Sequence, residues 1–408
     1  MGGELNCWNI TVQCKKMSMS IKEAVLTLHK QKRGKLEVVG MMEVNNGKDL
    51  ALVYTPGVVG PCLEIAKNKE KAYMYTMKGR AVAVITNGTA VLGLGNIGPE
   101  AGLPVVESKA LLLKKFADID AIPISIDSTD PDDIVNTIKN IAPGFGGIHL
   151  EDIKAPECFY IEERLKKILD IPVYHDDQHG TAIAVLAGLY NAIKIVKKSI
   201  GKIKVVINGA GASGIAVAKL LVFAGVKNIV LCDINGALVE SDDTLNAPQQ
   251  KIVEVTNRSF EKGSLEEVIK NKDVFIGLSV ANVLTKKMVG TMNKDSVVFA
   301  LANPVPEISP DEAKAGGARI VATGRSDFPN QINNVLVFPG IFKGALEVRV
   351  KDICDEMKIN AAKRIADLID DSELNEEYIV PSVFNKGVCE AVAYSVTSIA
   401  KKLGTARA

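Results

Sequence analysis

Hydrophobic and polar positions form two kinds of pattern along the chain, short apolar runs and amphipathic stretches. Their alternation predicts alternating strands and helices. Short apolar runs predict buried parallel strands at residues 81–86, 90–94, 121–126, 147–150 and 171–174. Amphipathic stretches predict helices at residues 20–33 (N-capped by Ser20 and stopped by Gly34), 108–117, 130–141 and 156–170. A long helix is expected over 181–198, the strand–helix alternation resumes over 203–330, and 341–408 is mostly helical. The pattern therefore predicts an α/β fold.

Two acidic couplets each follow one of these apolar runs. Glu151-Asp152 comes directly after the run 147–150, and Asp176-Asp177 comes after the run 171–174. A right-handed crossover through the helix 156–170 is expected to lay the two strands side by side or nearly so, with their carboxyl ends at one edge. Four carboxylates at one rim repel each other, and Mg²⁺ or Mn²⁺ with oxygen ligands resolves that conflict. For either couplet alone, the alternative interpretation is a pair of solvent-exposed acids on a loop at the rim of the sheet, with no bound cation.

A glycine-rich loop follows the apolar run 203–207 and leads into a predicted helix at 215–223. The first glycine of such a loop makes a tight turn, the second lets a pyrophosphate approach the backbone, and the third permits close helix–strand packing. Asp233, 19 residues after the last glycine, ends the next apolar run, where an acid accepts hydrogen bonds from an adenosine ribose. The predicted dinucleotide-binding residues are Gly209, Gly211, Ala212, Ser213, Gly214 and Asp233. Asp233 favours NAD over NADP, because a carboxylate repels a 2′-phosphate.

A second glycine-rich loop, residues 93–98, has the same glycine spacing. Pro99 and Pro104 follow it with Gly102 between them, so we expect no helix to begin there. No acid stands at the required offset at the end of a strand. We interpret this loop as part of a substrate domain and not as a second nucleotide site.

Composition narrows the class of protein. The chain has 408 residues, 47% of them hydrophobic and 24% charged, with a net charge of +1; this fits two or three domains and argues against a nucleic-acid-binding surface. Seven cysteines, an odd number without a C-x-x-C pair, predict free thiols in a reducing, cytoplasmic setting. No apolar run approaches the ~20 residues that a membrane span needs. Residues 1–18 fit either a non-native extension or a weak organelle leader.

Five further side chains carry potential chemistry: Tyr54, Lys109, Asn303, Asn333 and Asn334. Tyr54 precedes a Pro-Gly turn, and the three asparagines follow apolar runs. Lys109 is expected at the start of a helix, where the positive end of the dipole would lower the pKa of its amine. Each of these residues taken alone also has an ordinary structural explanation, such as a capped core tyrosine, a surface lysine or a turn-forming asparagine.

Taken together, the segments of the chain resemble malic enzymes along nearly its whole length. The resemblance is carried by YTPGV (54–58), GLGNIG (93–98), SKA (108–110), LED (150–152), HDDQHGTA (175–182), GAGASG (209–214), ANPVPE (302–307) and NNVLVFPG (333–340). The length is similar to that of the compact bacterial type. The resemblance implies an N-terminal α/β malic domain over 1–180, a Rossmann-like, doubly wound NAD(P)-binding domain over 181–340, and C-terminal helices over 341–408 that pack back on the core.

The resemblance also implies an activity, the metal-dependent oxidative decarboxylation of L-malate to pyruvate and CO₂ with reduction of NAD or NADP. Glu151, Asp152 and Asp177 would bind Mg²⁺ or Mn²⁺, which malate would chelate through its C2 hydroxyl and adjacent carboxylate. Lys109, held by Asp176, would be the general base on the hydroxyl, and Tyr54 would protonate C3 of the enolate. The substrate carboxylate and the ribose would be held by Asn303 and by Asn333 or Asn334.

One departure from the family pattern concerns the substrate. An arginine that precedes the loop corresponding to residues 93–98 in the longer enzymes is missing here, so the Thr89 hydroxyl, nearby backbone N–H groups or a second subunit must replace it. The alternatives to a malic enzyme are a malolactic-type enzyme that retains NAD and releases lactate, and a non-catalytic NAD-sensing module. A zinc site at His175 and His179 is disfavoured by the neighbouring acids. We expect a homodimer or larger homo-oligomer, in which a shared active site is an open alternative.

Overall fold

The computed structural model describes residues 21–91 and 93–408, and the chain divides into two compact units, Met1–Gly57 and Val58–Ala408. The first unit contains helices α2 (Ile21–Lys32) and α3 (Gly47–Val53). The Asn46 side chain caps α3 by accepting hydrogen bonds from the backbone N–H groups of Lys48 and Asp49. The predicted helix at 20–33 is thus confirmed, while its predicted cap, Ser20, lies outside the described residues.

A four-stranded parallel sheet lies in the second unit, in the order β2-β1-β3-β4. Its strands are β1 (Ala81–Thr86), β2 (Asp120–Ser125), β3 (Gly147–Leu150) and β4 (Val173–His175). β3 and β4 are direct neighbours, paired from Ile148 opposite Val173 to Leu150 opposite His175. The two strands that precede the acidic couplets therefore do end at the same edge, as their apolar runs predict.

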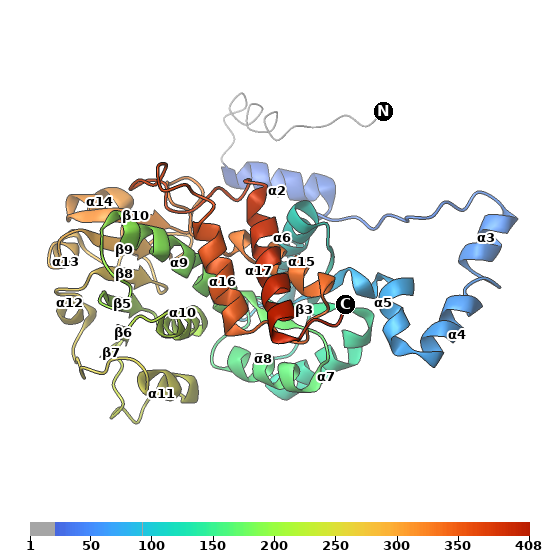
Figure 1. Ribbon diagram of the computed structural model, residues 1–408, viewed down its shortest axis with the longest axis horizontal. Coiled ribbons are helices and arrows are strands. Elements are labelled where there is room, and N and C mark those ends of the chain that lie inside the picture. Colours follow the sequence, from blue (N-terminus) through green and yellow to red (C-terminus); the bar gives the residue numbers. More distant parts are fainter. Residues whose placement is uncertain (1–20, 92) are drawn as a thin grey trace. The chain divides into compact units, whose positions relative to one another are not determined.

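A six-stranded sheet in the same unit has the order β10-β9-β8-β5-β6-β7 (Figure 1). Its strands are β5 (Lys204–Asn208), β6 (Asn228–Asp233), β7 (Gly236–Ala237), β8 (Val274–Gly277), β9 (Ser296–Ala300) and β10 (Ala318–Thr323). β5 pairs in parallel with β6 on one side and with β8 on the other, while only the short β7 is antiparallel. The chain therefore winds away from β5 in both directions, which confirms the predicted α/β class with a doubly wound second sheet.

The second unit also contains helices before, between and after these strands. They are α4 (Val59–Lys67), α5 (Ala72–Tyr75), α6 (Pro99–Ala117), α7 (Pro131–Ile141), α8 (Glu157–Ile168), α9 (Asp176–Ile195), α10 (Ala212–Phe223), α11 (Ala247–Val253), α12 (Leu265–Val268), α13 (Lys286–Val289), α14 (Pro310–Ala315), α15 (Phe338–Glu347), α16 (Asp355–Ala366) and α17 (Gly387–Leu403). α9 is apolar on nearly every side and packs against both α10 and α16. None of the described helices is long and apolar enough to span a membrane.

Three local predictions are wrong, and each error has a physical reason. Helix α6 begins at Pro99 and not near residue 108. Proline is favoured in the first turn of a helix, because the N–H group that it lacks would have no partner within the helix there. Pro104 lies inside α6. The segment 90–94 is not a strand: in its described part, Val91 makes an isolated bridge to Gly95. Helix α9 begins at Asp176 and not at 181, so the second acidic couplet is its first turn. The predicted domain boundaries at 180 and 340 stay predictions.

Candidate active site

Both acidic couplets meet at the shared edge of β3 and β4. Glu151, Asp152 and Asp177 offer carboxylate oxygens that all lie within 4.8 Å of one another. Asp152 adopts a left-handed backbone conformation (φ +53°), and its N–H donates to Oδ2 of Asp177 at 2.9 Å. The first turn of α9 carries Asp177, so the positive end of the helix dipole also stabilises this carboxylate.

Lys109 reaches the same edge from the middle of α6. Its Nζ lies 2.5 Å from Oδ2 of Asp176 and 3.0 Å from Oε1 of Glu151, with the Phe338 ring centroid 4.7 Å away. Burial disfavours the ammonium, but the carboxylates of Asp176 and Glu151 outweigh burial and raise the pKa of Lys109 above its ordinary value. The predicted lowering of this pKa is therefore wrong for the protein alone, because Lys109 does not stand at the helix start and faces carboxylates.

The carboxylates carry more negative charge than one ammonium neutralises. Burial raises the pKa of Glu151 to about 7 and that of Asp176 to about 6, although Lys109 opposes both shifts. Four acidic side chains share this edge with a single lysine, so a second cation is electrostatically favoured.

The second cation has one suitable place among the described residues. Two groups of side chains there could hold a metal ion: His149 with Glu151 and Asp176, and the group of Glu151, Asp152 and Asp177. The Lys109 ammonium already contacts two members of the first group. The second group presents only carboxylate oxygens, the donors that Mg²⁺ and Mn²⁺ prefer, and it fits such an ion.

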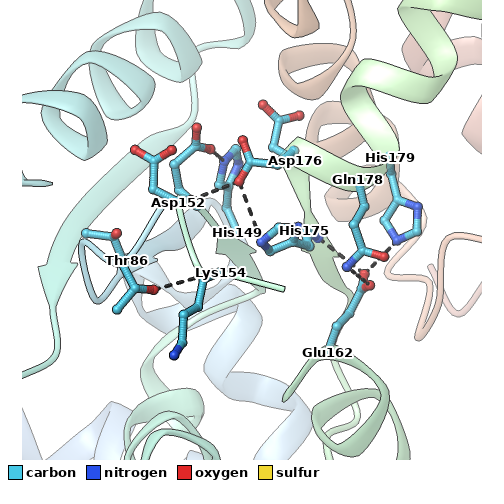
Figure 2. Close-up of polar contacts among 12 residues, drawn as sticks. Thr86, His149, Asp152, Lys154, Glu162, His175, Asp176, Gln178 and His179 are labelled. Carbon is cyan, nitrogen blue, oxygen red and sulfur yellow. Dashed lines mark hydrogen bonds and ion pairs between the residues drawn. The ribbon is translucent and has the colours of Figure 1, made fainter. Parts of the chain in front are cut away.

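A buried carboxylate, that of Glu162 in α8, is hydrogen-bonded to residues at the start of α9. It accepts hydrogen bonds from the His175 backbone N–H (3.2 Å), from Nε2 of Gln178 (3.1 Å) and from Nε2 of His179 (2.8 Å). Figure 2 shows Gln178 and His179 both directed at Glu162. Glu162 was not predicted from the sequence, although an acid on the buried, apolar side of an amphipathic helix was an available signal. His179 is thereby committed to Glu162 and is absent from both possible metal groups.

Thr89 lies beside the first couplet, but its hydroxyl is already engaged. The hydroxyl donates to Oδ1 of Asn87 at 2.6 Å and accepts from the Lys154 N–H at 3.0 Å. The Ala90 N–H donates to the Asp152 carbonyl at 3.0 Å. These bonds order the loop that carries Asp152, and the predicted role of Thr89 as a substrate ligand stays a prediction.

The glycine-rich loop after β5 has the geometry that a dinucleotide needs. Gly209 has φ +117°, and a Cβ there would collide with the Leu278 carbonyl oxygen. A Cβ on Gly214 would collide with the carbonyl oxygen of Gly209, whereas Gly211 faces open space. The loop leads into α10, whose first residues are Ala212 and Ser213, and Asp233 ends the neighbouring strand β6.

The remaining candidates occupy three different positions. The Asn303 carbonyl oxygen packs against Gly93, which brings the glycine-rich loop 93–98 to the end of the six-stranded sheet. Asn333 caps the short helix that begins at Asn334, and Asn334 borders Gly180 on the side where Asp176 also lies. Tyr54 belongs to the first unit, where it ends α3 with 65% of its surface exposed. The catalytic and binding roles of these residues stay predictions.

Comparison with known proteins gives matches over nearly the whole chain. The family model described as malic enzyme, N-terminal domain, matches residues 31–166, and the one described as malic enzyme, NAD binding domain, matches residues 178–401. A bifunctional malic/malolactic enzyme of Bacillus subtilis is 56% identical over 95% of this chain and 95% of its own. An NAD-dependent malic enzyme of Geobacillus stearothermophilus is 53% identical over 92% of this chain and 78% of its own. The crystal structure of a malic enzyme from Pyrococcus horikoshii superposes with a TM-score of 0.91 at 48% identity, covering 95% of this chain and 92% of that one.

Proposed function

The chain belongs to the malic enzyme family, and from this premise we propose that it oxidises L-malate to pyruvate and CO₂ while reducing NAD or NADP. This agrees with the resemblance found in the sequence. The observation that carries the proposal is the meeting of Lys109, Asp176 and the three-carboxylate group at one sheet edge. A non-catalytic NAD-sensing module would have no need for this buried arrangement of opposed charges.

The residues Glu151, Asp152 and Asp177 are proposed to hold Mg²⁺ or Mn²⁺. When bound, such an ion supplies positive charge that stabilises the oxygen anions formed at the substrate during oxidation and decarboxylation. Support comes from the oxygen-only donor set within 4.8 Å and from the excess of negative charge at the edge. The Asp152 N–H keeps Asp177 turned toward this group, which orders the site in advance.

Lys109 is proposed to remove the proton of the malate C2 hydroxyl. In the protein alone its ammonium is stabilised by Asp176 and Glu151, so it is a poor base. With a divalent cation bound, Glu151 would interact with two cations at once and would stabilise the Lys109 ammonium less. Asp176 keeps the amine in position through the 2.5 Å contact. Tyr54, with its exposed phenol, is proposed as the acid that protonates C3 in the last step.

The direct test is a spectrophotometric assay with L-malate, Mn²⁺ and either NAD or NADP. We expect absorbance at 340 nm to rise in step with pyruvate, and a chelator to abolish the reaction. Pyruvate formation without coenzyme reduction would contradict the proposal, and full activity in excess EDTA would contradict the cation site.

A second reaction is favoured by one observation, the name of the 56% identical Bacillus subtilis relative, which is a bifunctional malic/malolactic enzyme. If this chain shares that behaviour, part of the malate is converted to lactate while NADH is retained. Quantifying lactate and pyruvate in the same assay separates the two reactions. Lactate with no net absorbance change at 340 nm would make the malolactic reaction the main one.

We further propose a homodimer or larger assembly and a cytoplasmic location. Large apolar side chains are exposed in both units, among them Met41, Met42 and Leu52 in the first, and Leu63 and Met74 in the second. Such exposure favours a partner surface. Sedimentation of the full chain tests the assembly, and a monomer would contradict it. The free thiols of the described cysteines support a reducing compartment, which fractionation of the source cell would test.

A further inference from the structure

Two fully buried histidines stand beside the carboxylates, and the proposed reaction uses neither. Each lies two residues ahead of a proposed cation ligand: His149 in β3 precedes Glu151, and His175 at the end of β4 precedes Asp177. The exposed fraction of both side chains is 0%. Figure 2 shows both imidazole rings at the ends of neighbouring strands, next to the acidic groups. The two strands thus carry the same spacing of imidazole and carboxylate.

His149 is bonded to Glu151 and clamped by aromatic rings. Its Nε2 lies 2.7 Å from Oε2 of Glu151, and once Glu151 is ionised, as a cation ligand must be, Nε2–H is the donor in this hydrogen bond. The imidazole stacks on Phe342 at 5.7 Å and meets the edge of Phe338 at 5.4 Å, so the ring has little room to rotate. Oε1 of Glu151 is held by Lys109. Both oxygens of this ligand are therefore fixed before any cation binds.

His175 has the same relation to Asp177 at a longer distance. Its Nε2 lies 3.5 Å from Oδ2 of Asp177, beyond an ordinary hydrogen bond, and neither ring nitrogen has a hydrogen-bond partner among the described residues. A buried imidazole without a partner is unfavourable. A movement of well under 1 Å would bring Nε2 to hydrogen-bond distance of the carboxylate. The backbone N–H of His175 is meanwhile anchored to Glu162.

We propose that His149 is a positioning residue that holds Glu151 in its cation-binding orientation, and that His175 does the same for Asp177. The inference rests on the proposed cation site. Carboxylate ligands are oriented by the groups hydrogen-bonded to their other lone pairs, and loss of such a group weakens metal binding by about 10–100-fold. An N–H donor also reduces the repulsion between carboxylates that share one ion.

The test is Mn²⁺ binding to the full chain without substrate, followed by electron paramagnetic resonance of free Mn²⁺. His149→Phe keeps the aromatic packing and removes the donor, so we expect about 10–100-fold weaker binding. His149→Gln retains an N–H donor of similar reach and should recover affinity to within a few-fold of the unmodified chain. For His175→Asn we expect a loss of about 10-fold, the lower end of the range, because its contact is longer.

The matched control is Tyr174→Phe. The Tyr174 hydroxyl is buried in β4 without a hydrogen bond to any described residue, and the Tyr174 ring lies beside both His149 and Phe342. Removing this hydroxyl changes the same region without altering a proposed cation ligand, so Mn²⁺ affinity should not change. In a steady-state assay, His149→Phe should raise the Mn²⁺ concentration needed for half activity and recover most of kcat at saturating Mn²⁺. A general structural defect would lower kcat at every Mn²⁺ concentration.

Unchanged Mn²⁺ affinity in His149→Phe would overturn the proposal for His149, as would equal losses in the Gln and Phe variants. If His149→Phe does not fold, His149→Asn replaces it: its shorter side chain cannot reach Glu151, so it should bind Mn²⁺ about 10-fold more weakly than His149→Gln. Equal affinities of these two variants would also overturn it. Failure of the cation site itself is recognised separately, because then the unmodified chain would not bind Mn²⁺ or Glu151→Gln would bind it equally well.

Discussion

The two sheets of the second unit prepare their ligand sites with different means. At the edge of the four-stranded sheet, the site is built from charged and polar side chains: four carboxylates, one lysine and two histidines lie together in a nearly buried network. At the end of β5 in the six-stranded sheet, backbone shape is decisive: Gly209 and Gly214 allow close backbone packing, Gly211 faces open space, and Asp233 ends the neighbouring strand. The first site depends on charge, and the second depends on shape.

This difference predicts how each site fails. In a charge network, changing one member alters the protonation and position of the others, so losses should be large and not additive. In a glycine loop, a new methyl group either collides with the fold or occupies the place of the ligand, depending on where it points. Single substitutions in each site test this difference.

The largest effect is expected at Lys109. Lys109→Ala removes the proposed base, so kcat should fall by about 10²–10⁴-fold in the coupled malate assay. Lys109→Arg keeps a positive charge between Asp176 and Glu151 but cannot release its proton near neutral pH. It should lose a similar factor in kcat while its thermal stability stays closer to that of the unmodified chain. Undiminished malate oxidation by Lys109→Ala would contradict the assignment of the base.

The second couplet offers a sharper separation, because its two members face different partners. Asp177→Asn should weaken Mn²⁺ binding about 100-fold, which corresponds to about 2.8 kcal/mol. Asp176→Asn removes the contact to Lys109 and should lower kcat by about 10²-fold with a smaller effect on Mn²⁺ affinity. Binding and steady-state assays on both variants give the comparison. Equal loss of Mn²⁺ in the two would mean that the couplet is a single ligand pair.

The glycine loop should respond by position and not by charge. Gly214→Ala places a methyl group against the Gly209 carbonyl, and such overpacking costs about 1–3 kcal/mol of unfolding free energy, measurable by urea denaturation. Gly211 faces open space at φ −90°, so Gly211→Ala should be as stable as the unmodified chain. Its methyl group would meet the coenzyme instead, raising KM for NAD about 10-fold, or about 1.4 kcal/mol. Equal stabilities of the two variants would show that the predicted collision is relieved without cost.

The sequence was most informative where local pattern and topology agree. The apolar runs before the couplets and the strand–glycine–helix order predicted β3, β4, β5 and α10, because burial and turn geometry are local properties. The start of α6 was missed because proline was read as a helix breaker, although it is favoured in the first turn. Partners in space were also missed: Glu162 is distant in sequence from His179, and the pKa of Lys109 depends on residues brought close only by the fold. The proposed role of His149 could not be predicted from the sequence, because it depends on the contact between its ring and the Glu151 carboxylate.

An effect no larger than that of Gly211→Ala should come from Asp233, a charged residue of the shape-dependent site. Asp233→Ala removes the acid proposed to accept hydrogen bonds from the ribose and to repel a 2′-phosphate. We expect the preference for NAD over NADP, measured as the ratio of kcat/KM values, to fall about 10-fold, or about 1.4 kcal/mol. The matched control is Asn235→Ala, because only the backbone N–H of Asn235 binds Asp233, at 2.7 Å, and alanine keeps that donor. An unchanged ratio in Asp233→Ala would mean that the coenzyme is selected by shape alone, and the contrast between the two sheets would then be complete.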